Sequence, residues 1–301
     1  MTTVTMVLDY ALIGLSKSGP QLTRNIIFSV AKLLLLPVIA MTAGLGATGI
    51  YGAWFLGHLI SLIPLAARAN HSIWPELVRP GMVLKGLGRS ALAHHVTNTS
   101  SYAPVLVLPV VVAARLGTEA NAAFYAATLL ISSAWVITTH LATALFASAG
   151  AAPKDFARDL RFSLRISGTV AALTVLTAAP LAGPLLALFG AEYTRAQAGL
   201  VSLALATPFV SVKPLYIAVC RAEGQLRLGA RVALIASFVE ITAGAVGTLF
   251  GLTGTCAFFA VANFLEALVL WPRVARYAGL TIRSSRRPAS WTPPEPPTAQ
   301  D

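Results

Sequence analysis

The 301-residue sequence is 56% hydrophobic and only 11% charged, with a mean hydropathy of +0.74. A soluble protein carries about a quarter charged residues because its surface faces water, so this composition excludes an ordinary soluble enzyme. The net charge of +11 comes from 22 basic and 11 acidic residues. In a chain this apolar, such an excess first raises the question of whether the basic residues lie on one side of a membrane.

Apolar runs of about 20 residues recur along the chain, each long enough to cross a hydrocarbon core of about 30 Å. They are continuous and rich in Leu and Ala, which favours helices over alternating membrane strands. We predict one short partial helix over residues 4–15, which contains Asp9, and eight full spans: 25–45, 50–67, 91–114, 120–148, 164–188, 198–220, 232–252 and 253–271. Prolines inside these spans, such as Pro208 and Pro214, are expected to kink the helices, because neighbouring helices can satisfy the freed carbonyls.

The basic residues support this span count. When the predicted spans alternate across the membrane, eighteen Lys and Arg residues fall on one side, two (Arg115 and Arg195) fall on the other, and Lys32 and Lys213 lie within spans. Basic residues concentrate on the cytoplasmic side of membrane proteins. The C-terminus is therefore expected to be cytoplasmic. The high isoelectric point is explained by basic residues that face the anionic inner leaflet, so nucleic-acid binding is not needed to explain it.

The connecting segments suggest two lobes. The longest internal loop, 69–90, is predicted to be a cytoplasmic connection between a partial N-terminal lobe (1–68) and a six-helix C-terminal lobe (91–276). The remaining residues, 277–301, are polar and rich in proline and are expected to form a disordered cytoplasmic tail. The fold class is thus all-α: a polytopic membrane helix bundle of about eight full transmembrane helices plus a partial one.

Four short motifs carry a family resemblance. They are LDYALIG at 8–14, LLALFGAEYTR at 185–195, RAEGQLRLG at 221–229 and GLTGT at 251–255. In their order and spacing they resemble helix ends and turns of the polysaccharide flippases, a family of the multidrug/oligosaccharidyl-lipid/polysaccharide exporter superfamily. The resemblance extends over almost the whole chain up to residue 280.

The resemblance implies a transporter of the bacterial inner membrane, not an enzyme. It implies that two lobes alternate around a cavity and flip a polyprenyl-pyrophosphate-linked oligosaccharide for polysaccharide or lipopolysaccharide biosynthesis, coupled to H+ or Na+. Members of the family have twelve or more helices, so this sequence is expected to lack about the first four. A misassigned start, a degraded gene and a partner that supplies the remainder all stay open as explanations.

Ionisable residues inside spans are the candidate functional groups, because charge in a membrane is costly. Lys32 is a candidate to attract the pyrophosphate, with snorkelling to the inner interface as the alternative. Glu240, near the middle of its span, is a candidate to bind a proton or a sodium ion, with a hydrogen bond to a neighbouring helix as the alternative. Lys213 is a second candidate for substrate binding, and Glu266 is a second candidate for ion coupling. Because the two residues lie at similar depth in the membrane, they are alternatively predicted to form a structural salt bridge with each other.

Polar residues near the internal mouth complete the set. His95, Asn98 and Tyr102 are spaced by three and four residues and share a helix face, which suits either sugar recognition or a hydrated helix end. His140 either lines the cavity or is a hydrogen-bonded core histidine.

The sequence contains no phosphate-binding loop, no Cys/His spacing typical of a metal site and no Gly-x-Ser-x-Gly motif of hydrolases. No cofactor or metal is therefore expected. The rival functions are a cation-coupled multidrug exporter of the same superfamily, a membrane-embedded glycosyltransferase or polymerase, and a partial membrane protein that transports nothing.

Overall fold

The computed structural model describes residues 5, 8, 9, 18–43, 46–68, 88–151 and 153–280. These residues are almost entirely helical and include no strand, which confirms the all-α prediction. The chain forms two compact units, Met1–Leu87 (unit 1) and Gly88–Asp301 (unit 2). Of the predicted partial helix at 4–15 only residues 5, 8 and 9 are described, and all three are helical. Most of the predicted loop at 69–90 and the tail beyond residue 280 lie outside the described residues.

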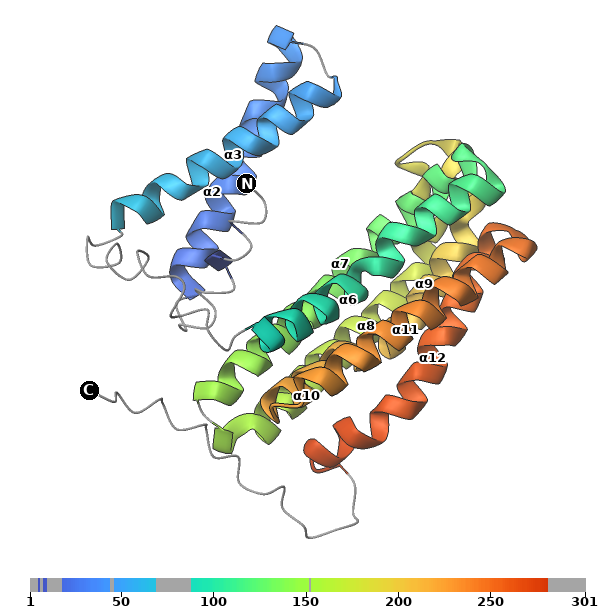
Figure 1. The fold of residues 1–301 in the computed structure, drawn as a ribbon. Helices are drawn as coiled ribbons and strands as arrows, with labels where there is room; N and C mark the ends of the chain where they lie inside the picture. The colour runs from blue at the N-terminus through green and yellow to red at the C-terminus, as the bar shows by residue number, and fades with distance from the viewer. Residues whose placement is uncertain are drawn as a thin grey trace. The chain divides into compact units, whose positions relative to one another are not determined.

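Unit 1 contains a pair of packed helices, α2 (Ser18–Ala43) and α3 (Ala47–Arg68) (Figure 1). Each has a proline in its interior, Pro37 and Pro64 respectively. Aromatic side chains join the two helices, because Phe28 of α2 stacks on His58 of α3 with ring centroids 4.1 Å apart. Phe28 also packs edge-on against Trp54, at 6.1 Å.

Unit 2 is a bundle of long helices (Figure 1). Its helices are α6 (Gly88–Leu116), α7 (Thr118–Ala151), α8 (Phe156–Ala187), α9 (Gln197–Val210), α10 (Val212–Ala222), α11 (Leu226–Gly247) and α12 (Gly251–Tyr277). Short 3-10 turns lie at Pro153–Asp155, Ala191–Ala196 and Thr248–Phe250. Among the described residues, a helix therefore lies at each of the eight predicted spans, although one of them is divided.

The divided span is the predicted helix 198–220, in which one turn residue beside the two prolines interrupts the helix, while the segment still forms a single membrane-span candidate, Ala191–Ala222. α9 ends at Val210, Ser211 forms a turn, and α10 begins at Val212. Pro208 and Pro214 have no N–H, so they cannot donate the helical hydrogen bonds to residues 204 and 210. The backbone N–H of Ser211 still donates to the carbonyl of Thr207, at 3.2 Å, and the Ser211 hydroxyl donates to the same oxygen, at 2.8 Å.

The segment formed by α9 and α10 runs through the interior of unit 2. In the most apolar 18-residue stretch of this segment, 72% is buried inside the protein. The corresponding share is 22–39% for the other membrane-span candidates of this unit. Leu200, Leu203 and Ala204 of α9 contribute to one hydrophobic core, and Leu215 and Val219 of α10 contribute to a second. The remaining helices surround this segment and leave much of their apolar surface exposed.

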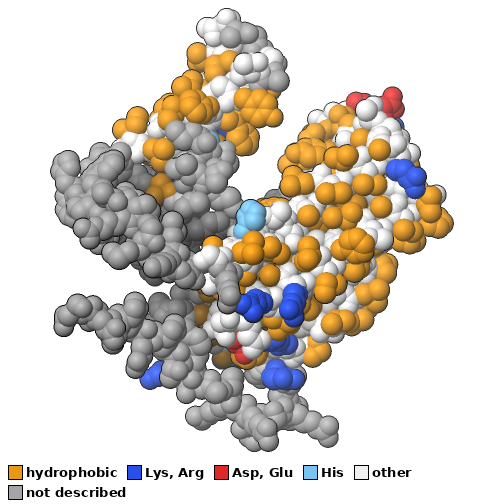
Figure 2. Space-filling model, viewed as in Figure 1, with side chains coloured by type: hydrophobic (Ala, Val, Ile, Leu, Met, Phe, Trp, Pro, Cys, Tyr) orange, Lys and Arg blue, Asp and Glu red, His pale blue; other side chains and the backbone are white. Residues whose placement is uncertain are grey.

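That exposed apolar surface fits a lipid environment. Six described segments are long and apolar enough to cross a membrane: Gly19–Thr42, Ser90–Leu116, Thr118–Ala149, Phe156–Ala187, Ala191–Ala222 and Leu226–Tyr277, the last of which combines α11 and α12. In Figure 2, hydrophobic side chains cover the visible face of unit 2 between its ends, and Lys and Arg side chains gather toward one end. Soluble monomers rarely expose apolar patches of this extent, so the surface supports a multi-pass membrane protein.

α11 and α12 approach each other very closely at their connection. Gly251 adopts φ +76°, a conformation that favours glycine, and begins α12. A Cβ atom at Gly247 would lie 2.5 Å from the carbonyl oxygen of Gly254. The turn therefore requires glycine at both Gly247 and Gly254, because only a residue without a side chain lets the two backbones come this near.

Candidate functional site: a buried charge cluster in unit 2

Three charged side chains meet in the interior of unit 2. The ammonium nitrogen of Lys213 lies 2.5 Å from Oε1 of Glu240 and 3.6 Å from Oε2 of Glu266. The side chains of Lys213, Glu240 and Glu266 are only 9%, 3% and 12% exposed. They come from α10, α11 and α12, so one cluster connects three helices. We refer to these three residues as the charge cluster.

The sequence places these charges where apolar residues surround them. Almost every residue of α10 is buried, from Val212 and Lys213 to Leu215–Cys220. Glu240 lies on the buried face of α11, together with Ala233, Ala236 and Gly244. Small residues on this face let α11 approach its neighbours, and the ion pair forms in a region with little access for water. Each charge must therefore be compensated inside the protein.

The compensation within the charge cluster is incomplete. Two carboxylates face one ammonium group, so the ionised cluster carries one net negative charge. Both oxygens of the Glu266 carboxyl are buried without a hydrogen-bond partner. A buried carboxylate in this condition is stabilised by a bound proton or by a small cation. The geometry thus suits the uptake of one monovalent positive charge.

Hydroxyl groups lie beside the break between α9 and α10, two residues before Lys213. Thr138 of α7 and Ser211 share a hydrogen bond of 3.2 Å, and Trp135 donates through Nε1 to the Thr207 hydroxyl at 3.3 Å. Thr138, Thr207 and Ser211 are all buried. These bonds hold α7 against the segment that carries Lys213.

Metal ligation has no support in the described part of the chain. No group of three or more His, Cys, Asp or Glu side chains there could hold a metal ion. Cys220 and Cys256 are both buried and free.

The predicted pairing of Lys213 with Glu266 is present, but the closer partner of Lys213 is Glu240. From the sequence we expected Glu240 either to bind a proton or a sodium ion or to be hydrogen-bonded to a neighbouring helix, and we did not pair it with Lys213. A signal for the larger cluster was available, because Lys213, Glu240 and Glu266 are the charged residues well inside the predicted spans of the six-helix lobe. Which of them meet depends on the rotation of three helices, which sequence position alone does not give.

Lys32 lies in unit 1 and interacts with aromatic rings. Its ammonium nitrogen is 4.6 Å from the ring centroid of Trp54 and 5.1 Å from that of Phe28. An ammonium over an aromatic face is stabilised by about 0.5–2 kcal/mol. Among the described residues Lys32 has no carboxylate partner, whereas the nearby Arg24 is paired with Asp9. The aromatic partners Phe28 and Trp54 were not foreseen from the sequence.

The stripe His95, Asn98 and Tyr102 lies on α6, where His95 and Tyr102 are exposed. Asn98 accepts a hydrogen bond of 2.9 Å from Arg221 of α10. Arg221 also lies over the Phe146 ring of α7, at 5.9 Å. One member of the stripe thus serves to join helices, and the other two face outward.

His140 lies on α7 and its side chain is exposed on the surface of unit 2. The structure therefore does not place it in the core of this unit. It lies on the helix that also carries Thr138, but the charge cluster is formed without it.

The sequence matches no protein-family model and none of the curated proteins compared with it. Solved structures of MATE proteins are similar in fold. One in the bent conformation has a TM-score of 0.65 at 15% identity over 88% of this chain and 63% of its own chain. One in the straight conformation has a TM-score of 0.60 at 16% identity, over 89% and 65%. The Vibrio cholerae MATE transporter VcmN in the bent form has a TM-score of 0.57 at 21% identity, over 86% and 62%.

These similarities establish a MATE-like helical bundle for this chain. The chain spans a little less than two thirds of each of these three structures.

Proposed function

We propose that this protein acts in membrane transport, by alternating access, and that it flips a polyprenyl-pyrophosphate-linked oligosaccharide coupled to H+ or Na+. The observation that supports transport most directly is the charge cluster inside a MATE-like unit. Buried charges in membrane bundles mark ion and substrate pathways. The motifs at 185–195 and 221–229, which resemble polysaccharide flippases, support the substrate class.

The coupling ion would neutralise the charge cluster. With Lys213 and both carboxylates ionised, binding of one H+ or Na+ brings the net charge to zero. A conformational change that exposes Glu266 to one side of the membrane and then to the other would move that ion along its gradient. Because Lys213 is buried and contacts Glu240, we assign it to this cluster in place of direct substrate binding.

The substrate phosphates would be attracted by Lys32. A flipped pyrophosphate must leave water, and a cation without a carboxylate partner compensates its charge. The aromatic faces of Trp54 and Phe28 hold the ammonium in place without neutralising it.

The test is flipping of a fluorescent polyprenyl-pyrophosphate-linked sugar in proteoliposomes, with a sodium or a proton gradient. The wild type is expected to flip the lipid faster with one gradient than with none. Glu266→Gln should retain basal flipping and lose the acceleration, whereas Lys32→Gln should slow flipping under every condition. Arg165→Gln, an exposed arginine with no described partner, is the control and should match the wild type. If wild-type protein shown to be folded gives no flipping above empty liposomes, the proposed function is wrong.

A multidrug exporter is the second candidate, and the structural similarity to MATE transporters favours it. An exporter of cationic drugs would be expected to offer a free carboxylate near the substrate. In unit 1, Asp9 is occupied by Arg24, and Lys32 adds a positive charge. Transport of a cationic dye that depends on Glu240 or Glu266, without any effect of Lys32→Gln, would favour the exporter.

A further inference from the structure

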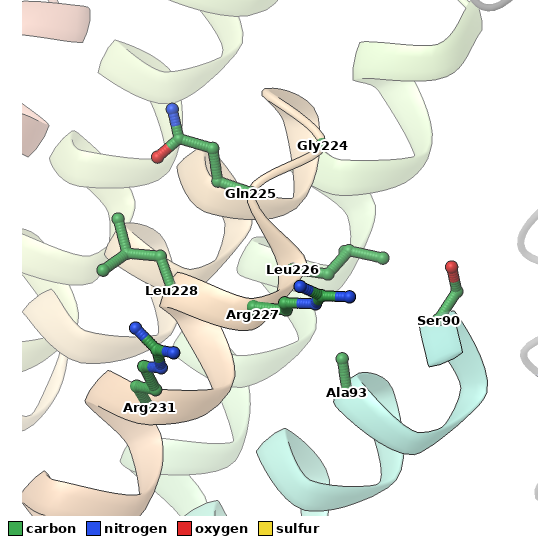
Figure 3. A pocket seen from close by; sticks show the side chains of 8 residues that line it. All are labelled: Ser90, Ala93, Gly224, Gln225, Leu226, Arg227, Leu228 and Arg231. Atoms are coloured by element: carbon green, nitrogen blue, oxygen red, sulfur yellow. The ribbon is translucent and has the colours of Figure 1, made fainter. Parts of the chain in front are cut away.

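A cavity of about 470 Å³ opens between the start of α6 and the start of α11. Its lining comes from Ser90 and Ala93 of α6, from the turn residues Gly224 and Gln225, and from Leu226, Arg227, Leu228 and Arg231 of α11 (Figure 3). Its volume lies within the range of small-molecule sites, about 300–1,000 Å³. The charge cluster contributes no residue to it, so the cavity is separate from the site described above.

The cavity is basic, and its two arginines have no described partner. Arg227 and Arg231 lie one helical turn apart on α11 and are both exposed. In Figure 3 the guanidinium of Arg227 points across the cavity toward Ser90 on α6. No ion pair or hydrogen bond joins either arginine to the described residues.

Neighbouring arginines at the same end of unit 2 differ in this respect. Arg221 is hydrogen-bonded to Asn98, and Arg273 is bonded to Glu223, Gln225 and Tyr216. The local carboxylate, Glu223, is thereby occupied by Arg273. The guanidinium groups of Arg227 and Arg231, which have no carboxylate partner among the described residues, can therefore pair with a bound anion.

The backbone of α11 adds to the positive potential. The first turn of α11 contains no acidic residue. The first N–H groups of a helix have no intrahelical acceptor and carry partial positive charge. Two guanidinium groups beside such a helix start suit a phosphate, which arginine binds through paired hydrogen bonds.

An apolar stripe continues from the arginines along the same face of α11. Leu234 and Phe238 follow Arg227 and Arg231 at helical spacing, and their side chains are 56% and 72% exposed. Residues 227, 231, 234 and 238 project within about 60° of one another around a helix of 3.6 residues per turn. A basic end joined to an exposed apolar stripe has the two-part character of a phospholipid, whereas a free phosphate would use only the basic end.

We propose that this cavity binds the phosphate headgroup of an anionic phospholipid, with an acyl chain lying along Leu234 and Phe238. Arg227 and Arg231 bind the phosphate, and the apolar stripe contacts the chain. The basic end of unit 2 is the one we expect at the cytoplasmic face, where the leaflet is anionic. The site does not depend on the proposed transport function.

The experiment is native mass spectrometry of the full chain in detergent, titrated with phosphatidylglycerol or with phosphatidylcholine. The wild type should bind phosphatidylglycerol about thirtyfold more tightly than phosphatidylcholine, since each of the two arginines contributes about 1 kcal/mol near an anionic lipid and about 1.4 kcal/mol corresponds to tenfold. Arg227→Gln/Arg231→Gln should abolish this preference. The matched control is Arg165→Gln/Arg276→Gln, which removes two exposed arginines outside the cavity and should keep the preference.

Two further arms separate the lipid from a free anion. Inorganic phosphate should not displace bound phosphatidylglycerol, and Leu234→Ser/Phe238→Ser should weaken lipid binding several-fold. Displacement by inorganic phosphate would overturn the lipid assignment. Equal loss in the cavity variant and the control variant would overturn the site. If the glutamine variant does not fold, Arg227→Lys/Arg231→Lys serves in its place, and binding equal to the wild type would overturn the paired arginine contact.

Discussion

Lys213 and Glu240 form an ion pair of 2.5 Å between α10 and α11, although the whole side chain of each is almost completely buried. The second carboxylate, on Glu266, lies 3.6 Å from the same ammonium nitrogen. One buried ammonium group thus faces two carboxylates, and the ionised cluster carries one more negative than positive charge. Several expected outcomes follow from this relationship and from the packing around it.

Lys213→Met should destabilise the protein strongly, by about 3–5 kcal/mol, because it leaves two carboxyl groups buried beside each other without a cation. Thermal unfolding in detergent, followed by circular dichroism, measures the change. The control is Arg158→Gln, which breaks an exposed pair with Asp155 and should alter stability by less than about 0.5 kcal/mol. Equal melting of Lys213→Met and the wild type would show that the buried pair does not contribute to stability.

Sodium ions should raise the melting temperature of the wild type relative to N-methylglucamine if sodium is the coupling ion. Saturating an ion site stabilises the folded state by mass action, and a shift of about 2–4 °C corresponds to about 1 kcal/mol in a domain of this size. Glu266→Gln should show no sodium-dependent shift, because the substitution removes the excess negative charge. A shift caused by acid in place of sodium would identify the proton as the ion, and an undiminished sodium shift in Glu266→Gln would place the ion elsewhere.

Gly247→Ala should destabilise unit 2 by about 1–3 kcal/mol, the usual result of overpacking. The added Cβ would lie 2.5 Å from the backbone oxygen of Gly254 and 2.7 Å from Cα of Thr255, so α11 and α12 would have to separate. Gly168→Ala on α8 is the matched control, because nothing lies within 4 Å of the added atom and alanine favours the helix. If both variants melt alike, the close approach of α11 and α12 is not required for stability.

Thr138→Val should have only a small effect, about 0.6 kcal/mol and at most about 2 kcal/mol, because single hydrogen bonds between membrane helices contribute little. The substitution removes the 3.2 Å hydrogen bond to Ser211 and keeps the side-chain volume nearly unchanged. The same unfolding measurement provides the test. A loss as large as that of Lys213→Met would mean that this contact between α7 and Ser211 contributes as much to stability as the charge cluster.

The orientation of unit 2 can be tested with cysteines at its two ends. The native thiols Cys220 and Cys256 are buried, so they should react little with a membrane-impermeant maleimide. Gln225→Cys, at the basic end, should react only after permeabilisation, whereas Glu192→Cys, at the opposite end, should react in spheroplasts. The opposite pattern would reverse the predicted orientation.

The class of fold could be predicted from the amino-acid sequence. Hydropathy and length predicted the helices, because a membrane span must be apolar over about 20 residues whatever its neighbours are. The one-sided distribution of basic residues predicted an end of the bundle rich in arginine, and Arg227, Arg231 and Arg276 do lie near one end of unit 2. The charged residues inside the spans, Lys213, Glu240 and Glu266, were also visible as exceptions to the apolar pattern.

Which of these residues meet could be learned only from the three-dimensional packing of the helices. Lys213 contacts both carboxylates because α10, α11 and α12 are rotated so that their polar positions face inward together, and no spacing along the chain determines that rotation. Two prolines marked the segment 198–220 in the sequence, but the interruption at Ser211, between α9 and α10, is seen only in the structure. Likewise, Arg227 and Arg231 became distinct from other basic residues only when the partners of Arg221 and Arg273 were seen, because pairing is a property of three-dimensional contact.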